Sequence, residues 1–277
     1  MSKKLPKRII SQIVFFLAQN PLLNNFISGT IYQGDFKKFC TPGLNCYSCP
    51  AAVLSCPLGS MQLFLAGAKQ SIGVYVAGFL LSTGVVFGRF ICGYVCPMGL
   101  LQDLIHKIKS PKVNTGLRFA KYLKYIVLMT FVLLLPLLVR HELSGLGEPW
   151  FCKYICPSGT VFAAFPLMAA NGFLRAMAGA LFTWKAALAV CIMLISVVIY
   201  RFFCRVLCPL GAIYSLFNKF AFIRMHHHKP SCVSCGVCRD KCPVIIDPVK
   251  QTNSPECIRC GKCISACSTK ALGYRRK

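Results

Sequence analysis

Eight cysteines near the C-terminal end of the chain have a spacing that suits metal ligation. They form two groups, each with the spacing C-x2-C-x2-C-x3-C, and a proline follows the last cysteine of the first group. Three thiolates two residues apart can wrap three corners of one iron–sulfur cube, so each cube still needs a fourth ligand. The groups are Cys232, Cys235, Cys238 and Cys242, and Cys257, Cys260, Cys263 and Cys267. We therefore expect two iron–sulfur clusters in this segment.

Residues 229 to 272 resemble bacterial two-[4Fe-4S] ferredoxin domains, in which the last cysteine of each group ligates the other cluster. The resemblance implies two ligand sets: Cys232, Cys235, Cys238 and Cys267 for one cluster, and Cys257, Cys260, Cys263 and Cys242 for the other. The chain departs once from the family, because Ser268 follows Cys267 where proline is usual. Structural zinc is the alternative, since paired C-x2-C motifs also suit tetrahedral sites. Groups of three plus one fit zinc less well than they fit cubes.

A second motif, C-P-x-G, occurs four times earlier in the chain, beginning at Cys56, Cys96, Cys156 and Cys208. Three copies have another cysteine four residues upstream, which gives C-x3-C-P; these cysteines are Cys92, Cys152 and Cys204. The first copy differs, because Cys46 and Cys49 lie ten and seven residues upstream. Proline is favoured at the first position of a helix. We therefore expect each C-P to open a short helix, with a cysteine at the N-terminus where the helix dipole favours a thiolate.

The composition indicates a membrane protein. Apolar residues make up 56% of the 277 residues, and the mean hydropathy is +0.59, above the range of most soluble proteins. The formal charge of +25 does not indicate nucleic-acid binding, because the basic residues are not interleaved with aromatics in a compact polar domain. The 19 cysteines favour metal ligation over a disulfide scaffold, because the chain is large and shows no clear signal-peptide cleavage site.

The apolar pattern predicts a mainly α-helical polytopic membrane domain over residues 1–225, and the ferredoxin resemblance implies a small α+β domain over residues 229–277. A hydrocarbon core of about 30 Å needs roughly 20 apolar residues. The pattern predicts four transmembrane helices, at about 9–29, 71–88, 119–139 and 184–203. Residues 9–29 contain several amides and a proline, so an interfacial helix is the alternative there. Residues 161–182 are apolar but interrupted, which predicts re-entrant or interfacial helices.

Lysine and arginine bias predicts the orientation. With the N-terminus inside, segments 1–8, 89–124 and 201–277 hold 25 basic residues, whereas the outer segments 30–70 and 140–185 hold 7. We therefore expect a multi-pass protein of a bacterial or archaeal cytoplasmic membrane, with both termini and the ferredoxin domain in the cytoplasm.

This topology sorts the C-P-x-G motifs onto two sides of the membrane. An inner cluster would use Cys92, Cys96, Cys204 and Cys208, whose two C-P cysteines are 112 residues apart. An outer cluster would draw on Cys152, Cys156, Cys46, Cys49 and Cys56. Buried free thiols are the alternative for both sets, and a disulfide is a further alternative for the outer set. Cys40 fits no motif, and Cys191, in mid-span, is expected to be a packed thiol.

Together, the C-x3-C-P motifs beside apolar spans and the ferredoxin repeat resemble the membrane-bound polyferredoxins of the NapH, NosR and YccM type, over nearly the whole chain. The resemblance implies electron transfer between a quinone pool, or a redox partner outside the cytoplasm, and cytoplasmic carriers. It implies two [4Fe-4S] clusters in the ferredoxin domain and one or two further iron–sulfur clusters in the membrane domain. The alternative function is a factor that reduces a metal or thiol while another membrane enzyme matures. A transporter or sensor regulated by clusters is a third hypothesis.

The sequence contains no sign of a self-sufficient enzyme. No nucleotide-binding glycine loop, Ser-His-Asp set or pair of catalytic carboxylates is recognisable, and only seven residues are acidic. An electron-transfer subunit of an oxidoreductase system is therefore expected, with redox proteins on one or both faces of the membrane as partners and with no nucleic acid.

Overall fold

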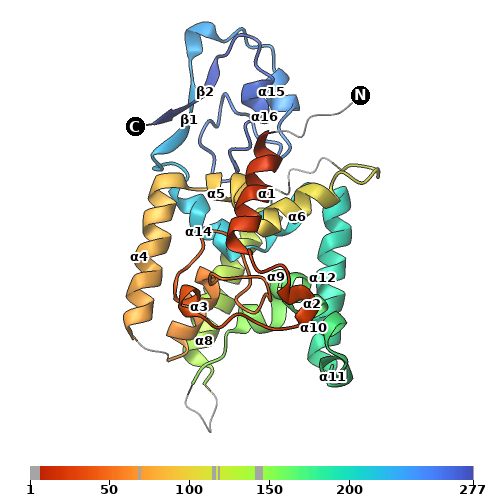
Figure 1. Ribbon diagram of the computed structural model, residues 1–277. Coiled ribbons are helices and arrows are strands. Elements are labelled where there is room, and N and C mark those ends of the chain that lie inside the picture. The colour runs from red at the N-terminus through yellow and green to blue at the C-terminus, as the bar shows by residue number, and fades with distance from the viewer. Residues whose placement is uncertain (1–6, 68–69, 114–116, 118, 141–145, 277) are drawn as a thin grey trace.

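The computed structural model describes residues 7–67, 70–113, 117, 119–140 and 146–276. Helices make up a long bundle, and a small domain with two strands lies at one end of it (Figure 1). The bundle contains the α-helices α1 (Lys7–Gln19), α2 (Asn25–Ser28), α3 (Pro57–Leu65), α4 (Gln70–Phe87), α5 (Phe90–Tyr94), α6 (Pro97–Ile105), α7 (Leu123–Val127), α8 (Leu135–Leu138), α9 (Pro157–Gly159), α10 (Phe165–Ala170), α11 (Gly172–Ala176), α12 (Ala180–Val198), α13 (Phe202–Val206) and α14 (Pro209–Phe217).

Shorter 3-10 and π-helical turns connect these helices. The 3-10 turns are η1 (Asp35–Lys38) and η2 (Ala120–Tyr122), and the π-helical turns are η3 (Leu128–Leu134), η4 (Phe151–Ile155) and η5 (Thr160–Ala164). The small domain contains β1 (Ile223–His227), the 3-10 turn η6 (Lys229–Ser231), α15 (Val237–Asp240), α16 (Lys262–Ser265) and β2 (Leu272–Arg276).

Each C-P-x-G motif opens a helix, as the sequence predicts. Proline is the first residue of α3, α6, α9 and α14, and the preceding cysteine is the N-cap with extended backbone. Proline suits this position because its fixed φ is already helical and its missing N–H would have no intrahelical partner there. The preference of proline for the first helical position therefore fixes the backbone conformation at the cysteine of each C-P-x-G motif.

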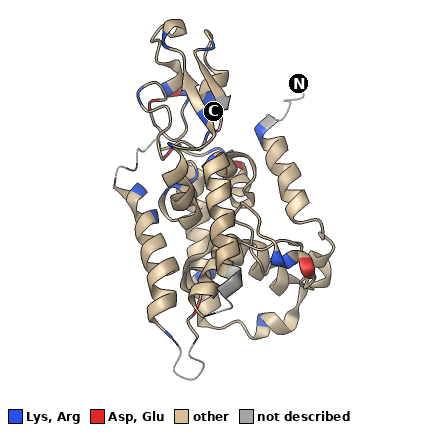
Figure 2. Ribbon diagram, turned by 90° about the vertical axis from the view of Figure 1, so that its left-hand side faces the viewer, with Lys and Arg blue, Asp and Glu red and all other residues tan. Residues whose placement is uncertain are grey.

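Among the residues that the structure describes, two helices are long and apolar enough to cross a membrane: Ala120–Leu138, which joins η2, α7, η3 and α8, and Ala180–Val198, which is α12. They correspond to the third and fourth predicted spans. The second predicted span corresponds to α4, which has 18 residues and contains the shorter apolar helix Gly73–Phe87. Long stretches of the helix surface carry no charge (Figure 2). These features give the protein its membrane-associated character.

The first predicted span, 9–29, is not one helix in the structure. Helix α1 ends at Gln19 after 13 residues, a length of about 20 Å at 1.5 Å per residue. The Asn20 side chain donates to the Phe16 carbonyl at 2.9 Å and accepts from Asn45 at 3.0 Å. These amides are buried inside the protein, which ends the helix where a transmembrane helix would have continued.

Residues 161–182 are broken into short helices, as their interrupted pattern indicates. Helix α10 ends at Asn171, whose backbone is extended, and α11 follows directly. Neither helix is long enough to cross a hydrocarbon core.

The ferredoxin domain has a two-fold internal repeat in its backbone. Ser234, Gly236 and Ile245 have positive φ, and so do the residues 25 positions later, Arg259, Gly261 and Lys270. The glycines adopt this left-handed conformation without steric cost. Strand β1 pairs antiparallel with β2, with Ile223 opposite Arg276 and His227 opposite Leu272, so the paired sheet begins before the predicted boundary at residue 229.

A buried ion pair connects the helix that the first inner motif opens with the residue just before the second inner motif. Asp103 of α6 accepts from Arg201, just before α13, at 2.9 Å and 2.5 Å, and Arg8 of α1 is 3.0 Å away. Burial alone would raise the pKa of Asp103, but the charges of Arg201 and Arg8 outweigh burial and lower it to about 2. The carboxylate therefore stays ionised and holds three helices together.

Replacing Asp103 by Asn should lower the free energy of unfolding by about 3–5 kcal/mol, because the buried Arg201 charge would lose its counter-charge. Denaturant titration of the purified protein in detergent measures this loss. Asp35→Asn is the control, since the Asp35–Lys38 pair is solvent-exposed and should give no measurable change. Equal effects of the two substitutions would contradict the role assigned to Asp103.

Candidate metal centres

Four cavities in the structure are each lined by four cysteines, and we number them from the ferredoxin end. Site I has Cys232, Cys235, Cys238 and Cys267; site II has Cys242, Cys257, Cys260 and Cys263; site III has Cys92, Cys96, Cys204 and Cys208; site IV has Cys46, Cys56, Cys152 and Cys156. Sites I, II and III bring together the sets expected from the sequence.

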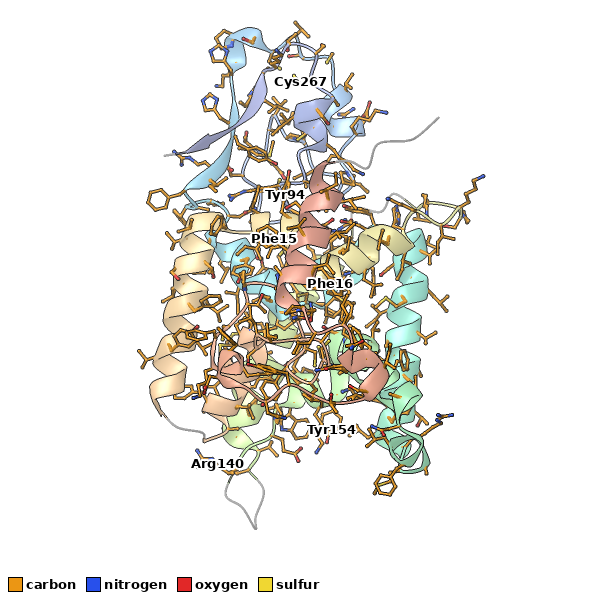
Figure 3. The ribbon with its side chains drawn as sticks, viewed as in Figure 1. Phe15, Phe16, Tyr94, Arg140, Tyr154 and Cys267 are labelled. Atoms are coloured by element: carbon orange, nitrogen blue, oxygen red, sulfur yellow. The ribbon has the colours of Figure 1, made fainter. Side chains whose placement is uncertain are left out.

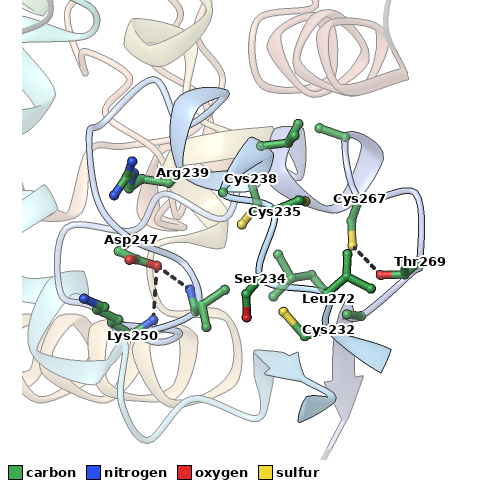
Figure 4. Close-up of a pocket in the computed structure, with 16 residues that line it drawn as sticks. Cys232, Ser234, Cys235, Cys238, Arg239, Asp247, Lys250, Cys267, Thr269 and Leu272 are labelled. Atoms are coloured by element: carbon green, nitrogen blue, oxygen red, sulfur yellow. Dashed lines mark hydrogen bonds between the residues drawn. The ribbon is translucent and has the colours of Figure 1, made fainter. Parts of the chain in front are cut away.

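Site I is the more open of the two sites in the ferredoxin domain, and its cavity has a volume of about 400 Å³. Its cysteines surround the cavity in Figure 4, where the hydroxyl of Thr269 lies 3.6 Å from the sulfur of Cys267. Asp247 accepts from the backbone N–H of Val249 at 2.9 Å, which closes the loop on one wall. The fourth cysteine, Cys267, comes from the second group.

Site II lies within the ferredoxin domain, and its walls are mainly apolar. Cys242 of the first group joins the three cysteines of the second group, and Met225, Val244, Ile246 and Ile258 are among the lining residues. The sulfur of Cys257 is 3.7 Å from the sulfur of Met225. The fourth cysteine is therefore exchanged between the two groups, as in the ferredoxins that this segment resembles.

Site III is enclosed in the main hydrophobic core, and all four of its cysteines are buried. Three N–H groups point at its sulfurs: the backbone of Gly211 at 3.3 Å from Cys208, the backbone of Leu44 at 3.4 Å from Cys96, and the Gln102 amide at 3.0 Å from Cys204. Donors of this kind stabilise negative charge on sulfur and tune iron–sulfur centres.

Two fully buried arginines cross over site III. Arg89 and Arg201 each lie three residues before the first cysteine of a C-x3-C-P pair. Arg89 donates to the carbonyl of Cys204 at 3.0 Å, and Arg201 donates to the carbonyl of Cys92 at 2.5 Å. The arginine that precedes each C-x3-C-P motif thus hydrogen-bonds to the backbone of the other motif, which explains why arginines border these cysteines in the sequence.

Glycine is favoured at the fourth position of the two C-P-x-G motifs of site III because the helix packs onto a carbonyl there. A Cβ on Gly99 would lie 2.8 Å from the Cys92 oxygen, and one on Gly211 would lie 3.1 Å from the Cys204 oxygen. Real Cβ atoms do not approach so closely without displacing their neighbours. In the C-x3-C-P-x-G motif, this glycine therefore lets the helix that follows the second cysteine pack against the backbone of the first cysteine.

Site IV lies on the other side of the core from the ferredoxin domain. Cys56 belongs to the copy that lacks the upstream cysteine, since Ala52 stands at that position, and Cys46 lines the cavity in its place. Cys49 does not line it, and its sulfur faces the Asn20 side chain at 3.7 Å. The Lys185 ammonium donates to the Cys152 carbonyl at 3.1 Å, as the arginines do at site III.

Besides Cys49, two cysteines lie apart from these sites. Cys40 is buried, with its sulfur 4.0 Å from the Ser60 hydroxyl. Cys191 is exposed on α12, so the expectation of a packed thiol in mid-span is wrong. It lies on the outward face of an apolar helix rather than between helices.

The free thiols differ from the expectation that helix N-termini would favour thiolates. Burial raises the pKa of Cys156 to about 11, although backbone N–H groups of α9 oppose it, and burial likewise raises the pKa of Cys96. Desolvation of the charged form outweighs the helix terminus at these positions. A bound metal would hold these sulfurs as thiolates, because coordination deprotonates a thiol.

The spacing of the sulfurs suits a cluster better than a single ion. Among the residues that the structure describes, no three cysteine, histidine or carboxylate groups are close enough to share one metal ion. Tetrahedral zinc would draw four sulfurs to about 2.3 Å from one centre. A cube distributes its ligands over four irons and takes four cysteine thiolates, and each of these cavities is lined by four cysteines. The donor sets therefore fit [4Fe-4S] clusters.

Neighbouring sites share residues. Leu44 lines both site III and site IV. Ile258 lines site II, and its carbonyl would be 2.6 Å from a Cβ on Gly93, next to Cys92 of site III. Leu272 lines site I and packs with Cys257 and Cys263 of site II. The four sites form one series through the molecule.

Figure 3 shows the ends of this series. Cys267 lies in the ferredoxin domain, Tyr94 lies just below that domain, and Tyr154 lies toward the opposite end of the bundle. Tyr94 stands between Cys92 and Cys96 of site III, and Tyr154 between Cys152 and Cys156 of site IV. The series therefore runs along the long direction of the molecule.

Glu256 joins the ferredoxin domain to the helices. Its carboxylate is 3.3 Å from Arg89 and 2.5 Å from Lys124, and the neighbouring residue is Cys257 of site II. Arg89 also holds the carbonyl of Cys204 in site III. One buried guanidinium thus contacts segments of both sites.

The fold and the sites define a mainly helical, membrane-associated iron–sulfur protein. The chain matches a family of 4Fe-4S binding domains over residues 70–115, 125–166 and 181–230, and each matched segment contains one C-x3-C-P motif. It is 30% identical over 229 residues to an uncharacterized protein of Methanocaldococcus jannaschii, which covers 79% of this chain and 85% of that protein. The chain therefore belongs to the 4Fe-4S ferredoxin-type electron-transport proteins.

Two other relatives carry descriptive names. The methylamine utilization ferredoxin-type protein MauN of Paracoccus denitrificans is 31% identical, over 73% of this chain and 66% of that protein. The putative electron transport protein YccM of Escherichia coli is 26% identical, over 65% of this chain and 48% of that protein. No solved structure matches the chain.

Gly99→Ala should disrupt site III, because the added methyl group would collide with the Cys92 carbonyl. We expect a lower melting temperature and less bound iron per chain than in the parent protein. Gly78→Ala, in α4, is the matched control, since a Cβ there meets nothing within 4 Å and should be neutral or stabilising by up to about 1 kcal/mol. Normal iron content in Gly99→Ala would refute the steric explanation for this glycine.

Proposed function

We propose that the protein is a membrane-bound electron relay with four [4Fe-4S] clusters, one at each of sites I to IV. It would connect a quinone pool, or a redox partner outside the cytoplasm, with carriers in the cytoplasm. The proposal rests on the series of four cavities, each lined by four cysteines. One residue links each cavity to the next: Leu272 between sites I and II, Ile258 between sites II and III, and Leu44 between sites III and IV.

Bound clusters would supply one-electron chemistry, and the chain supplies their positions and surroundings. Apolar residues exclude water from sites II and III. Backbone and amide N–H groups face the sulfurs, and Arg89 and Arg201 place positive charge beside the four thiolates of site III. A cluster with cysteine ligands is anionic, so these cations and donors oppose the cost of burying it.

The proposed orientation places the ferredoxin domain and both termini in the cytoplasm and site IV nearer the outer face. The excess of lysine and arginine in segments 1–8, 89–124 and 201–277 supports this orientation. Residues 1–6 of the first segment lie outside the described residues. The membrane domain would extend to about residue 222, and the ferredoxin domain would begin at β1.

Protein purified without oxygen should contain roughly 16 iron and 16 sulfide per chain, because four sites would each hold a cube of four irons. Iron and acid-labile sulfide assays on a known protein concentration measure this, and EPR of the reduced protein reports the cluster type. A value near eight would confine clusters to the ferredoxin domain and reject the relay.

The fourth ligand of site IV can be tested with neighbouring cysteines. Cys46→Ala should remove about four irons per chain, because Cys46 lines the cavity. Cys49→Ala is the matched control and should keep the full content, because its sulfur faces Asn20. The opposite pattern would exchange the roles of the two cysteines, and no loss in either variant would remove site IV from the relay.

A further inference from the structure

Sites III and IV contain the same side-chain clasp, formed by a glutamine. At site III, Gln102 donates through Nε2 to the sulfur of Cys204 at 3.0 Å, and its Oε1 accepts from the backbone N–H of Phe203 at 3.1 Å. At site IV, Gln62 donates to the sulfur of Cys152 at 3.2 Å, and its Oε1 accepts from the N–H of Phe151 at 3.0 Å. Each glutamine thus grips one cysteine and the residue before it.

The two glutamines occupy equivalent sequence positions. Each is the sixth residue after the cysteine of a C-P-x-G motif, in α3 and α6. Each reaches the first cysteine of the opposite C-x3-C-P pair, about 90 to 100 residues away in the chain. The other two motifs have Phe162 and Tyr214 at this position. Each site therefore combines one glutamine-bearing half with one aromatic-bearing half.

The amide orientation at both positions is fixed by its partners. Both side chains are fully buried, and each Nε2 also donates to the carbonyl four residues earlier, from Gln62 to Leu58 at 3.2 Å and from Gln102 to Met98 at 3.3 Å. A flipped amide would place its oxygen against this carbonyl and its NH2 against a backbone N–H. Only one orientation satisfies all the groups, so the donor faces the sulfur.

We propose that Gln62 and Gln102 raise the reduction potentials of the clusters at sites IV and III, respectively, an inference that rests on the proposed function. Reduction adds one electron from an external reductant to a cluster, and part of the added negative charge falls on the cysteine sulfurs. An N–H donor stabilises the more negative state more strongly than the oxidised state. The effect is strengthened in a buried site, because the local dielectric constant is low.

The test uses anaerobically purified parent protein and three variants, Gln102→Met, Gln62→Met and Gln12→Met. Methionine keeps most of the volume and removes the donor. Gln12 is the matched control, because it is also fully buried but bonds Asp103 and no sulfur. Iron content is measured first, and the midpoint potentials then come from EPR-monitored titration with dithionite and redox mediators.

We expect each site variant to keep the iron content of the parent and to shift one midpoint potential downward while the other potentials stay unchanged. Gln102→Met should shift a different signal from Gln62→Met, and Gln12→Met should shift none. The shift for Gln102→Met should be the larger, because all four cysteines of site III are buried whereas Cys46 and Cys152 of site IV are partly exposed.

A second variant covers the case in which methionine disturbs the loop. Gln102→Glu keeps an oxygen for the Phe203 N–H but presents no NH2 to the sulfur, and should lower the same potential. Unchanged potentials in fully loaded variants, or a loss of about four irons in both Gln102→Met and Gln102→Glu, would overturn the inference; the second result would make the clasp a purely structural support. Parent protein with about eight irons would instead refute the proposed function.

Discussion

The structure depends on the exchange of buried cations between the two halves of site III. Arg89 holds the Cys204 carbonyl and Arg201 holds the Cys92 carbonyl, so neither C-x3-C-P pair is completed by its own segment. A buried guanidinium requires counter-charges and acceptors, and these come from Glu256 for Arg89 and from Asp103 for Arg201. The position of site III thereby becomes linked to the ferredoxin domain on one side and to α1 and α6 on the other.

Sites III and IV are variations on one plan. In each, a helix opened by C-P faces a C-x3-C-P pair, a glutamine clasps the first cysteine of that pair, and a cation holds the carbonyl of the same cysteine. At site III the cation at Cys204 is Arg89, whereas at site IV the cation at Cys152 is Lys185. The plan is broken where Ala52 replaces the upstream cysteine, and a longer loop brings Cys46 to the cavity instead.

The proposed clusters in the core would explain features that would otherwise be energetically costly. Burying arginines and amides in a hydrophobic core costs free energy, and burial raises the pKa values of the thiols so that they stay protonated. They become consistent when the same sites hold anionic clusters, because the cations and donors then have charge to stabilise. The hydrophobic core of the helical domain accordingly contains the four cysteines of site III and, from site IV, Cys56, Cys152 and Cys156.

The sequence alone determined the features that depend on short spacing. The ferredoxin groups, the helices opened at Pro57, Pro97 and Pro209, and the two longest apolar helices follow from rules that act over a few residues or one helix length. Only the tertiary structure decided which of Cys46 and Cys49 lines site IV, because both lie in an irregular loop. The glutamine clasps carried a weak signal, a repeated C-P-x-G-x2-Q, but their partners are about 90 and 100 residues away. The early end of the first helix also depended on tertiary structure. Its amides bond to residues inside the protein, and no local pattern specifies which distant residue will satisfy a polar group.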